Sequence, residues 1–159
     1  GYVPKNYYIS NIHLDEKNVT RRPPHVVHER NVTIYDLLDE NYFKPNGSLN
    51  GPFVLSLSIK ENRLVFNIAL ENGDKVDRFN LSLNFFRRIV KDYFIVCESY
   101  FEAIKSAPPS RIETLDVGRR SLHNEGADIL RDRLVGKVEL DKRTARGLFT
   151  LICVLHIKV

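Results

Sequence analysis

The chain has 159 residues, with 24 lysines and arginines against 20 aspartates and glutamates and no tryptophan. A chain of this length can bury a hydrophobic core without disulfides or a metal, so we expect residues 1–159 to form a single domain. The net charge of +4 allows an anionic partner without requiring one. No apolar stretch is long enough for a bilayer, so we expect no membrane partner.

Both cysteines, Cys97 and Cys153, lie within apolar runs of the sequence. Cysteines in such positions are typical of small buried thiols rather than of a disulfide framework. Free thiols favour a reducing compartment, and the first residues show no signal-peptide pattern. We therefore expect a cytoplasmic protein.

The N-terminal third of the chain predicts one strand and one helix. Residues 7–15 alternate imperfectly, as a half-buried strand does, with Ile12 on one face and Ile9 on the other. After two prolines, Val27 to Tyr42 has the apolar spacing of a helix, which brings together Val27, Ile34, Leu37 and Leu38.

From Phe53 to Leu83 the apolar residues alternate with a period of two. Three runs, 53–59, 63–70 and 78–83, are separated by short turns, which predicts an antiparallel meander with one apolar face. Asn72-Gly73 in the second turn favours a type I′ turn, because both central residues there need positive φ.

The following helix is expected to cover that face. Asn84 is a suitable N-cap for a helix that runs to about Ser106, with a broad apolar arc typical of a central core helix. On its polar side, Arg88 and Asp92 are four residues apart, as in an ion pair on a solvated face.

The C-terminal third predicts two further helices and a short strand. Ser110 and Glu113 have the spacing of a capping box for residues 111–135, where Gly118 and Gly126 leave open whether there is one helix or two. KVEL at 137–140 is expected to be an edge strand. Asp141 can cap a last helix through Ile152, and for the tail 150–159 we favour helix over strand. The fold class is thus α+β, an antiparallel meander with an N-terminal strand packed against a long central helix and C-terminal helices.

Several segments have distinctive sequences, namely FRRIVKDYF at 86–94, CESYFEAI at 97–104, PSRIE at 109–113, GRRSLHNEG at 118–126 and TARGLFTLICVL at 144–155. With HER at 28–30 and GPF at 51–53, they resemble an uncharacterised family of small bacterial proteins, of the alphaproteobacterial type. The resemblance covers nearly the whole chain. It implies a bacterial cytoplasmic protein that folds as one unit, and it implies no activity, cofactor or partner.

The segment from Gly118 to Gly126 concentrates polar chemistry in a few residues. If residues 111–135 form one helix, Arg119 falls on its apolar stripe, and a buried guanidinium needs a carboxylate or a bound anion. One interpretation is an internal ion pair of Arg119 or Arg120 with Asp116, Glu113 or Asp92. The other is an anion-binding site built from Arg119, Arg120, His123 and Asn124.

Other candidate sites are weaker. His25 and His28 lie about one helical turn apart beside Glu29, but no third ligand has a recognisable spacing, so we expect no metal. Phosphate-binding glycine motifs are also missing, and we expect no cofactor. A secondary basic surface is expected from Arg87, Arg88 and Lys91, extended by Arg131, Arg133, Lys137, Lys142, Arg143 and Arg146.

These observations favour a non-catalytic binding or assembly module. Its basic segment would engage an anionic partner, which would be an acidic protein, RNA or a small phosphorylated ligand. An alternative is an enzyme in which His123 or Glu125 acts as acid or base while Arg119 and Arg120 hold an anionic substrate. A second alternative is a homo-oligomer whose apolar tail from Leu148 is buried by another subunit.

Overall fold

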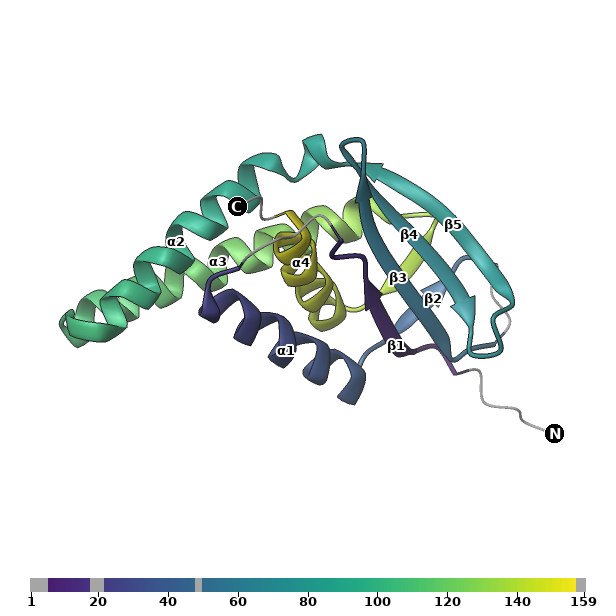
Figure 1. The fold of residues 1–159 in the computed structure, drawn as a ribbon, viewed down its shortest axis with the longest axis horizontal. Helices are drawn as coiled ribbons and strands as arrows, with labels where there is room; N and C mark the ends of the chain where they lie inside the picture. Colours follow the sequence, from purple (N-terminus) through teal and green to yellow (C-terminus); the bar gives the residue numbers. More distant parts are fainter. Residues whose placement is uncertain (1–5, 18–21, 48–49, 157–159) are drawn as a thin grey trace.

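The main sheet has four strands and combines parallel with antiparallel pairing. The computed structural model describes residues 6–17, 22–47 and 50–156. Strands β1 (Ile9–Leu14), β3 (Phe53–Lys60), β4 (Arg63–Leu70) and β5 (Lys75–Ser82) lie side by side in that order (Figure 1). The last three form the predicted antiparallel meander, and β1 pairs parallel to β3. The α+β fold class is confirmed.

β1 does not follow the simple alternation expected of residues 7–15. Ile9 and Ile12 are both buried, although strict alternation would place them on opposite faces. The pairing with β3 is irregular between Ile9 and Asn11, where β1 contains one extra residue. A bulge of this kind reverses the alternation, and here it turns both isoleucines towards the core.

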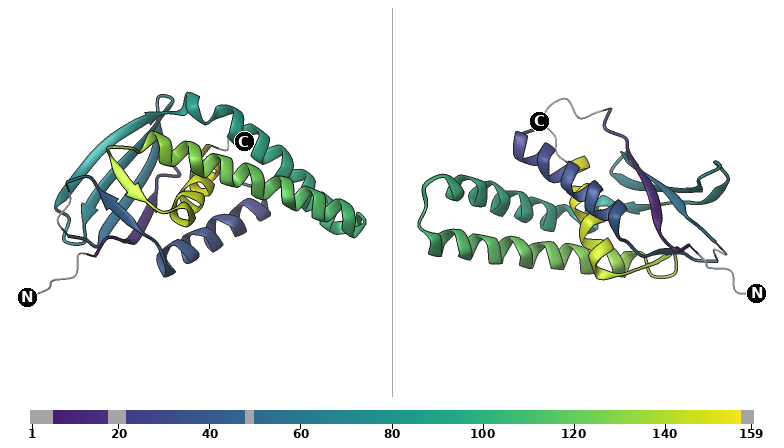
Figure 2. Two further views of the ribbon diagram at one scale, coloured as in Figure 1. Left: turned by 180° about the vertical axis from the view of Figure 1, so that it is seen from behind. Right: turned by 90° about the horizontal axis from the view of Figure 1, so that it is seen from below.

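The described residues contain four helices, α1 (Pro24–Asp39), α2 (Arg87–Ser106), α3 (Pro109–Arg133) and α4 (Lys142–His156). α1 and α4 make the main helix contacts with the sheet. α2 and α3 form a long antiparallel hairpin whose closed end extends away from the sheet (Figure 2). α4 lies between this hairpin and the sheet, with α1 beside it. None of the helices in the described part of the chain is both long and apolar enough to cross a membrane.

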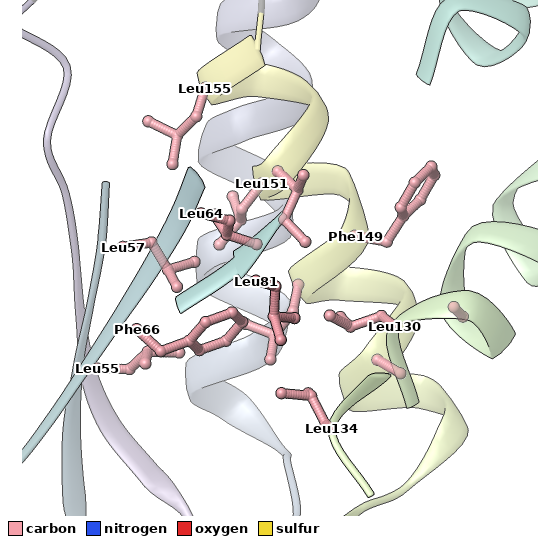
Figure 3. Packing of buried hydrophobic residues seen from close by; sticks show 14 of the residues in the cluster. Leu55, Leu57, Leu64, Phe66, Leu81, Leu130, Leu134, Phe149, Leu151 and Leu155 are labelled. Atoms are coloured by element: carbon pink, nitrogen blue, oxygen red, sulfur yellow. The ribbon is translucent and has the colours of Figure 1, made fainter. Parts of the chain in front are cut away.

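The helix over the centre of the sheet is α4, not the helix expected to begin at Asn84. Ten of the 15 residues of α4 are buried. Figure 3 shows Leu151 and Leu155 on its sheet side, near Leu57 and Leu64, and Phe149 on its opposite side. α2 contributes to the core through Ile89, Val90, Tyr93 and Cys97. A wide apolar arc predicts that a helix is buried, but it does not identify the element that the helix contacts.

The chain enters α2 through a 3₁₀ turn, η1 (Leu83–Phe85), so the predicted N-cap at Asn84 is wrong. Asn84 instead accepts a hydrogen bond on Oδ1 from Asn62 Nδ2, at 3.1 Å. Asn62 lies in the two-residue turn between β3 and β4, where φ is 50° at Glu61 and 63° at Asn62. Positive φ at both central residues therefore occurs there. At Asn72-Gly73, only Gly73 has positive φ, so the predicted type I′ turn is wrong.

α3 is one continuous helix through Gly118 and Gly126, which settles the question that the sequence left open. The predicted capping box is wrong, because α3 begins at Pro109 and Ser110 lies inside it. Proline suits the first helical position, where a backbone N–H has no partner in any case.

The remaining boundaries agree with the sequence in type and differ in detail. α1 begins three residues before Val27, and of its expected cluster only Leu37 is fully buried. β6 (Val138–Leu140) is the predicted edge strand, and it pairs with an unpredicted strand, β2 (Phe43–Pro45). Asp141 Oδ1 accepts from the backbone N–H of Thr144 at 3.0 Å, which confirms the cap. The tail is helical through His156, and residues 157–159 lie outside the described residues.

Candidate functional site

Two glycines allow the flanking helices to approach α4 closely. A Cβ on Gly147 of α4 would lie 2.6 Å from Leu37 Cδ2 of α1. A Cβ on Gly126 of α3 would lie 2.5 Å from Cε1 of the Phe149 ring. Both partners are buried. The positions of α1 and α3 relative to α4 are therefore set by apolar side chains that rest on glycine.

This arrangement leaves a cleft of about 480 Å³, with α1 and α3 as its walls and α4 as its floor. We call it the three-helix cleft. All four predicted anion-binding residues line it, and they come from one turn and a half of α3. The full lining set is Glu29, Val32, Thr33, Asp36, Leu37, Glu40, Arg119, Arg120, His123, Asn124, Arg143, Arg146, Gly147 and Thr150.

Arg119 lies on the inner side of α3, as the helical spacing predicted. Its Nη2 donates to Asp116 Oδ1 at 2.7 Å, and its guanidinium carbon lies 5.0 Å from the centre of the Tyr100 ring. The predicted internal ion pair with Asp116 is confirmed. The hydrogen bond from Arg119 also lowers the pKa of Asp116. Arg119 Nε is buried without a hydrogen-bond partner.

Arg120 and Arg146 each have one polar side-chain partner among the described residues, so both keep unused N–H donors. Arg120 Nε lies 3.2 Å from Asp116 Oδ2, and 62% of its side chain is exposed. Arg146, on the floor, donates from Nη1 to Asn124 Oδ1 at 3.2 Å. Within the described residues, Arg146 forms no ion pair with a carboxylate. Because the Asn124 oxygen faces Arg146, its amide nitrogen remains available as a donor.

His123 is held by the floor of the cleft. Its Nε2 lies 2.9 Å from the carbonyl oxygen of Arg146 and 2.6 Å from Thr150 Oγ1. A carbonyl oxygen only accepts, so Nε2 carries the proton and Nδ1 the lone pair. Burial lowers the pKa of His123, as do the nearby charges of Arg146 and Arg119, while the carbonyl opposes this. His123 is therefore neutral at neutral pH.

Glu125 and the secondary basic surface lie elsewhere. Glu125 is exposed, and its Oε1 accepts from Arg88 Nη2 at 2.5 Å. Arg88 also bonds Asp92 at 3.2 Å, as predicted. Arg87 donates to Asn62 Oδ1 at 2.7 Å and, with Lys91, lines a separate groove between α1 and α2. The expected surface of Arg87, Arg88 and Lys91 is thus divided between two sides of α2.

The other candidate residues have structural surroundings. The His25 ring stacks on Phe101 with centroids 4.6 Å apart. Over residues 6–17, 22–47 and 50–156, no three histidine, cysteine or acidic side chains are grouped as metal ligands would be. Cys97 and Cys153 are buried free thiols, as predicted. Burial raises the pKa of Cys97 to about 11, and that of Cys153 well above its usual value.

Sequence reasoning missed half of the cleft. Arg143 and Arg146 were assigned only to a diffuse basic surface, and Thr150 was assigned to the tail. These three residues are three and four positions apart, which forms a polar stripe on an otherwise apolar helix. That stripe is the signal that could have identified the floor. The α1 wall has a comparable signal, because Glu29 and Asp36 are seven residues apart and so lie on one side of the helix.

Comparisons with known proteins cover nearly the whole chain. The profile described as "Uncharacterised protein family (UPF0262)" matches residues 6–158. A UPF0262 protein of Paramagnetospirillum magneticum is 51% identical over 98% of this chain and 99% of its own length. One from Chelativorans is 58% identical over 91% and 90%, and one from Brucella canis 54% over 95% and 94%. No solved structure matches the chain.

Proposed function

This chain belongs to the uncharacterised protein family UPF0262, and we propose that it is a non-catalytic binding module whose three-helix cleft holds an anionic group. The observation that carries this proposal is Arg146. Its guanidinium lies on the cleft floor, and among the described residues it has only the Asn124 oxygen as a side-chain partner. A guanidinium with unused donors in a concave site is suited to a carboxylate or phosphate.

Two neighbours would complete the anion site. Arg120 contributes a second guanidinium from the α3 wall, and Asn124 contributes its amide N–H groups. Arg119 has a different part in this proposal, because its interactions with Asp116 and Tyr100 fix its position. His123 supports the floor by donating to the Arg146 carbonyl, which leaves Nδ1 as an acceptor and gives it no proton for an anion.

The same geometry disfavours the enzyme alternative. A general acid or base must reach the reacting group. His123 faces the cleft floor, whereas Glu125 bonds Arg88 outside the cleft, so the two side chains do not converge. The oligomer hypothesis also loses its basis, because Leu148 to Leu155 are buried within this chain. Two buried free thiols support a cytoplasmic location.

Inorganic phosphate and pyrophosphate are the first probes, measured by calorimetry and by the shift in melting temperature. We expect both to bind, and Arg146→Gln to weaken binding by at least about fivefold, since it removes a charge-assisted contact. Arg111→Gln is the matched control, because Arg111 is exposed on α3 outside the cleft. The proposal fails if neither anion binds or if both variants bind equally well.

The partner class follows from a second comparison with the same variants. A cleft of about 480 Å³ suits a compact group, so we favour a small phosphorylated or carboxylated ligand over RNA or an acidic protein. A short single-stranded RNA and an acidic peptide are titrated at two salt concentrations. If RNA binds with a steep salt dependence and Arg146→Gln binds it as tightly as the wild type, the RNA binds to a surface other than the cleft.

A further inference from the structure

The α1 wall of the three-helix cleft is acidic. Glu29 and Asp36 lie on the side of α1 that faces the cleft, about two turns apart, and Glu40 follows directly after the last residue of the helix. Glu40 accepts from Arg143 Nη1 of α4 at 2.7 Å, which links this wall to the floor at one end. In the part of the chain that the structure describes, neither Glu29 nor Asp36 forms an ion pair.

Charges of opposite sign therefore face one another across the cleft without pairing. Arg146 and Arg120 lie on the floor and the α3 wall, and Glu29 and Asp36 on the α1 wall. The backbones of these helices are kept in place by the packing of Leu37 on Gly147 and of Phe149 on Gly126. Because packing fixes the distance between the helices, the acidic and basic side chains stay on opposite sides of the cleft and do not draw together into ion pairs.

We propose that the ligand of the three-helix cleft is a small zwitterion. Its anionic group would bind Arg146 and Arg120, and its protonated amine would bind Asp36 and Glu29. This inference rests on the proposed function and specifies its ligand class. A simple anion would be attracted by the arginines but repelled by the carboxylates of the acidic wall. A zwitterion would place its anionic group at the arginines and its ammonium group at the carboxylates.

Phosphoethanolamine and ethyl phosphate form a matched pair of probes, because they share a phosphate ester and differ by one ammonium group. We expect the wild-type chain to bind phosphoethanolamine about two- to fivefold more tightly, as one added ion pair at a partly exposed site allows. Ethylamine, which has only the cationic group, should bind more weakly than either. Calorimetry measures all three.

Asp36→Asn should bring the affinities for phosphoethanolamine and ethyl phosphate close to one another. It should do so by weakening phosphoethanolamine binding, while ethyl phosphate binds as well as before or more tightly. Asp39→Asn is the matched control, because Asp39 is exposed on α1 and does not line the cleft. Thermal melting confirms that both variants fold. A preference that survives both Asp36→Asn and Glu29→Gln would overturn the zwitterion inference.

The outcomes separate this inference from the proposed function. If ethyl phosphate binds the wild type as tightly as phosphoethanolamine, and Arg146→Gln weakens both, the cleft binds anions and the zwitterion inference is wrong. If no phosphate compound binds, the proposed function itself fails. A preference for phosphoethanolamine that disappears in Asp36→Asn and persists in Asp39→Asn supports both.

Discussion

α4 and α3 both border the three-helix cleft, but they are stabilised in different ways. Ten of the 15 residues of α4 are buried, against three of the 25 residues of α3. α4 is therefore positioned by the hydrophobic core. α3 relies on its length, on a few apolar contacts near its C-terminal half, and on ion pairs such as Arg119 with Asp116. The four binding residues predicted from the sequence all come from α3, the helix that contributes less to the core.

This difference has a consequence for variants of the protein. Substitutions at the buried positions of α4 should change the free energy of unfolding, whereas substitutions of Arg120 and Asn124 on α3 should change binding with little effect on stability. The α3 wall contributes little to the core, so substitutions on its surface can change which ligand the cleft binds without destabilising the fold. The following experiments test that division of roles.

The largest effect is expected from Phe149→Ala in α4. The ring is fully buried and contacts Tyr93 with centroids 5.7 Å apart, so its removal leaves a cavity between α2, α3 and α4. We expect a loss of about 3–5 kcal/mol in urea unfolding. Val117→Ala, at a position 53% exposed on α3, should cost less than about 0.5 kcal/mol. Equal losses would contradict the comparison.

Two glycines within α3 give a sharper test. Gly126→Ala places a methyl group against the buried Phe149 ring, and we expect a loss of about 1–3 kcal/mol from overpacking. At Gly118 a Cβ would meet only Val96 Cγ1, at 3.9 Å. Gly118→Ala should therefore stabilise the helix by about 0.5–1 kcal/mol. The prediction is wrong if both variants shift the unfolding midpoint in the same direction.

The pH dependence of stability should reveal the buried state of His123. Its folded pKa lies below the ordinary 6.5, mainly because of burial. The unfolded chain then binds the proton more tightly, so this contribution is complete above the unfolded pKa and is lost as pH falls below it. We expect the free energy of unfolding to fall between about pH 7 and pH 5. His123→Gln should show a smaller fall, since it cannot titrate.

The smallest effect concerns the two thiols. Burial raises the pKa of both cysteines, and Cys153 of α4 is the more deeply buried, at 1% exposed against 8% for Cys97 of α2. Because the thiolate is the reactive form, both should react slowly with a thiol reagent in the folded protein, and Cys153 more slowly. Single Cys97→Ala and Cys153→Ala variants assign the rates. Fast reaction at Cys153 without unfolding would argue against a rigid α4.

Local patterns predicted the parts of the fold that depend on neighbours in the sequence. The meander follows from alternation between Phe53 and Leu83, and the Asp141 cap from a single side chain that reaches the next turn. By contrast, the predicted helix caps at Asn84 and Ser110 are wrong, because a 3₁₀ turn and a proline begin these helices. The bulge in β1 also has no clear signal in the sequence, since it arises from pairing with a strand far along the chain.

Only the α3 wall of the three-helix cleft could be predicted as a site from the sequence. The amphipathic pattern of α3 identified Arg119 as anomalous and Asp116 as one of its three candidate partners. Both predictions were possible because Arg119 and Asp116 lie within one helix. The rest of the cleft depends on which helices meet. Nothing local to Gly147 indicates that Leu37 rests on it, so the opposition of Glu29 and Asp36 to Arg146 emerges only after packing.

The parallel pairing of β1 with β3 has a consequence for the order in which the molecule assembles. Ile9 pairs with Phe53, whereas β3, β4 and β5 join through short turns. Contacts between distant segments cost more chain entropy and form late. β1 and α1 contact the remaining elements through segments that are distant in the sequence. We therefore expect α1, which carries the acidic wall of the cleft, to dock last during folding. We expect amide hydrogens of α1 to exchange before those of β4, which hydrogen-exchange measurements can check.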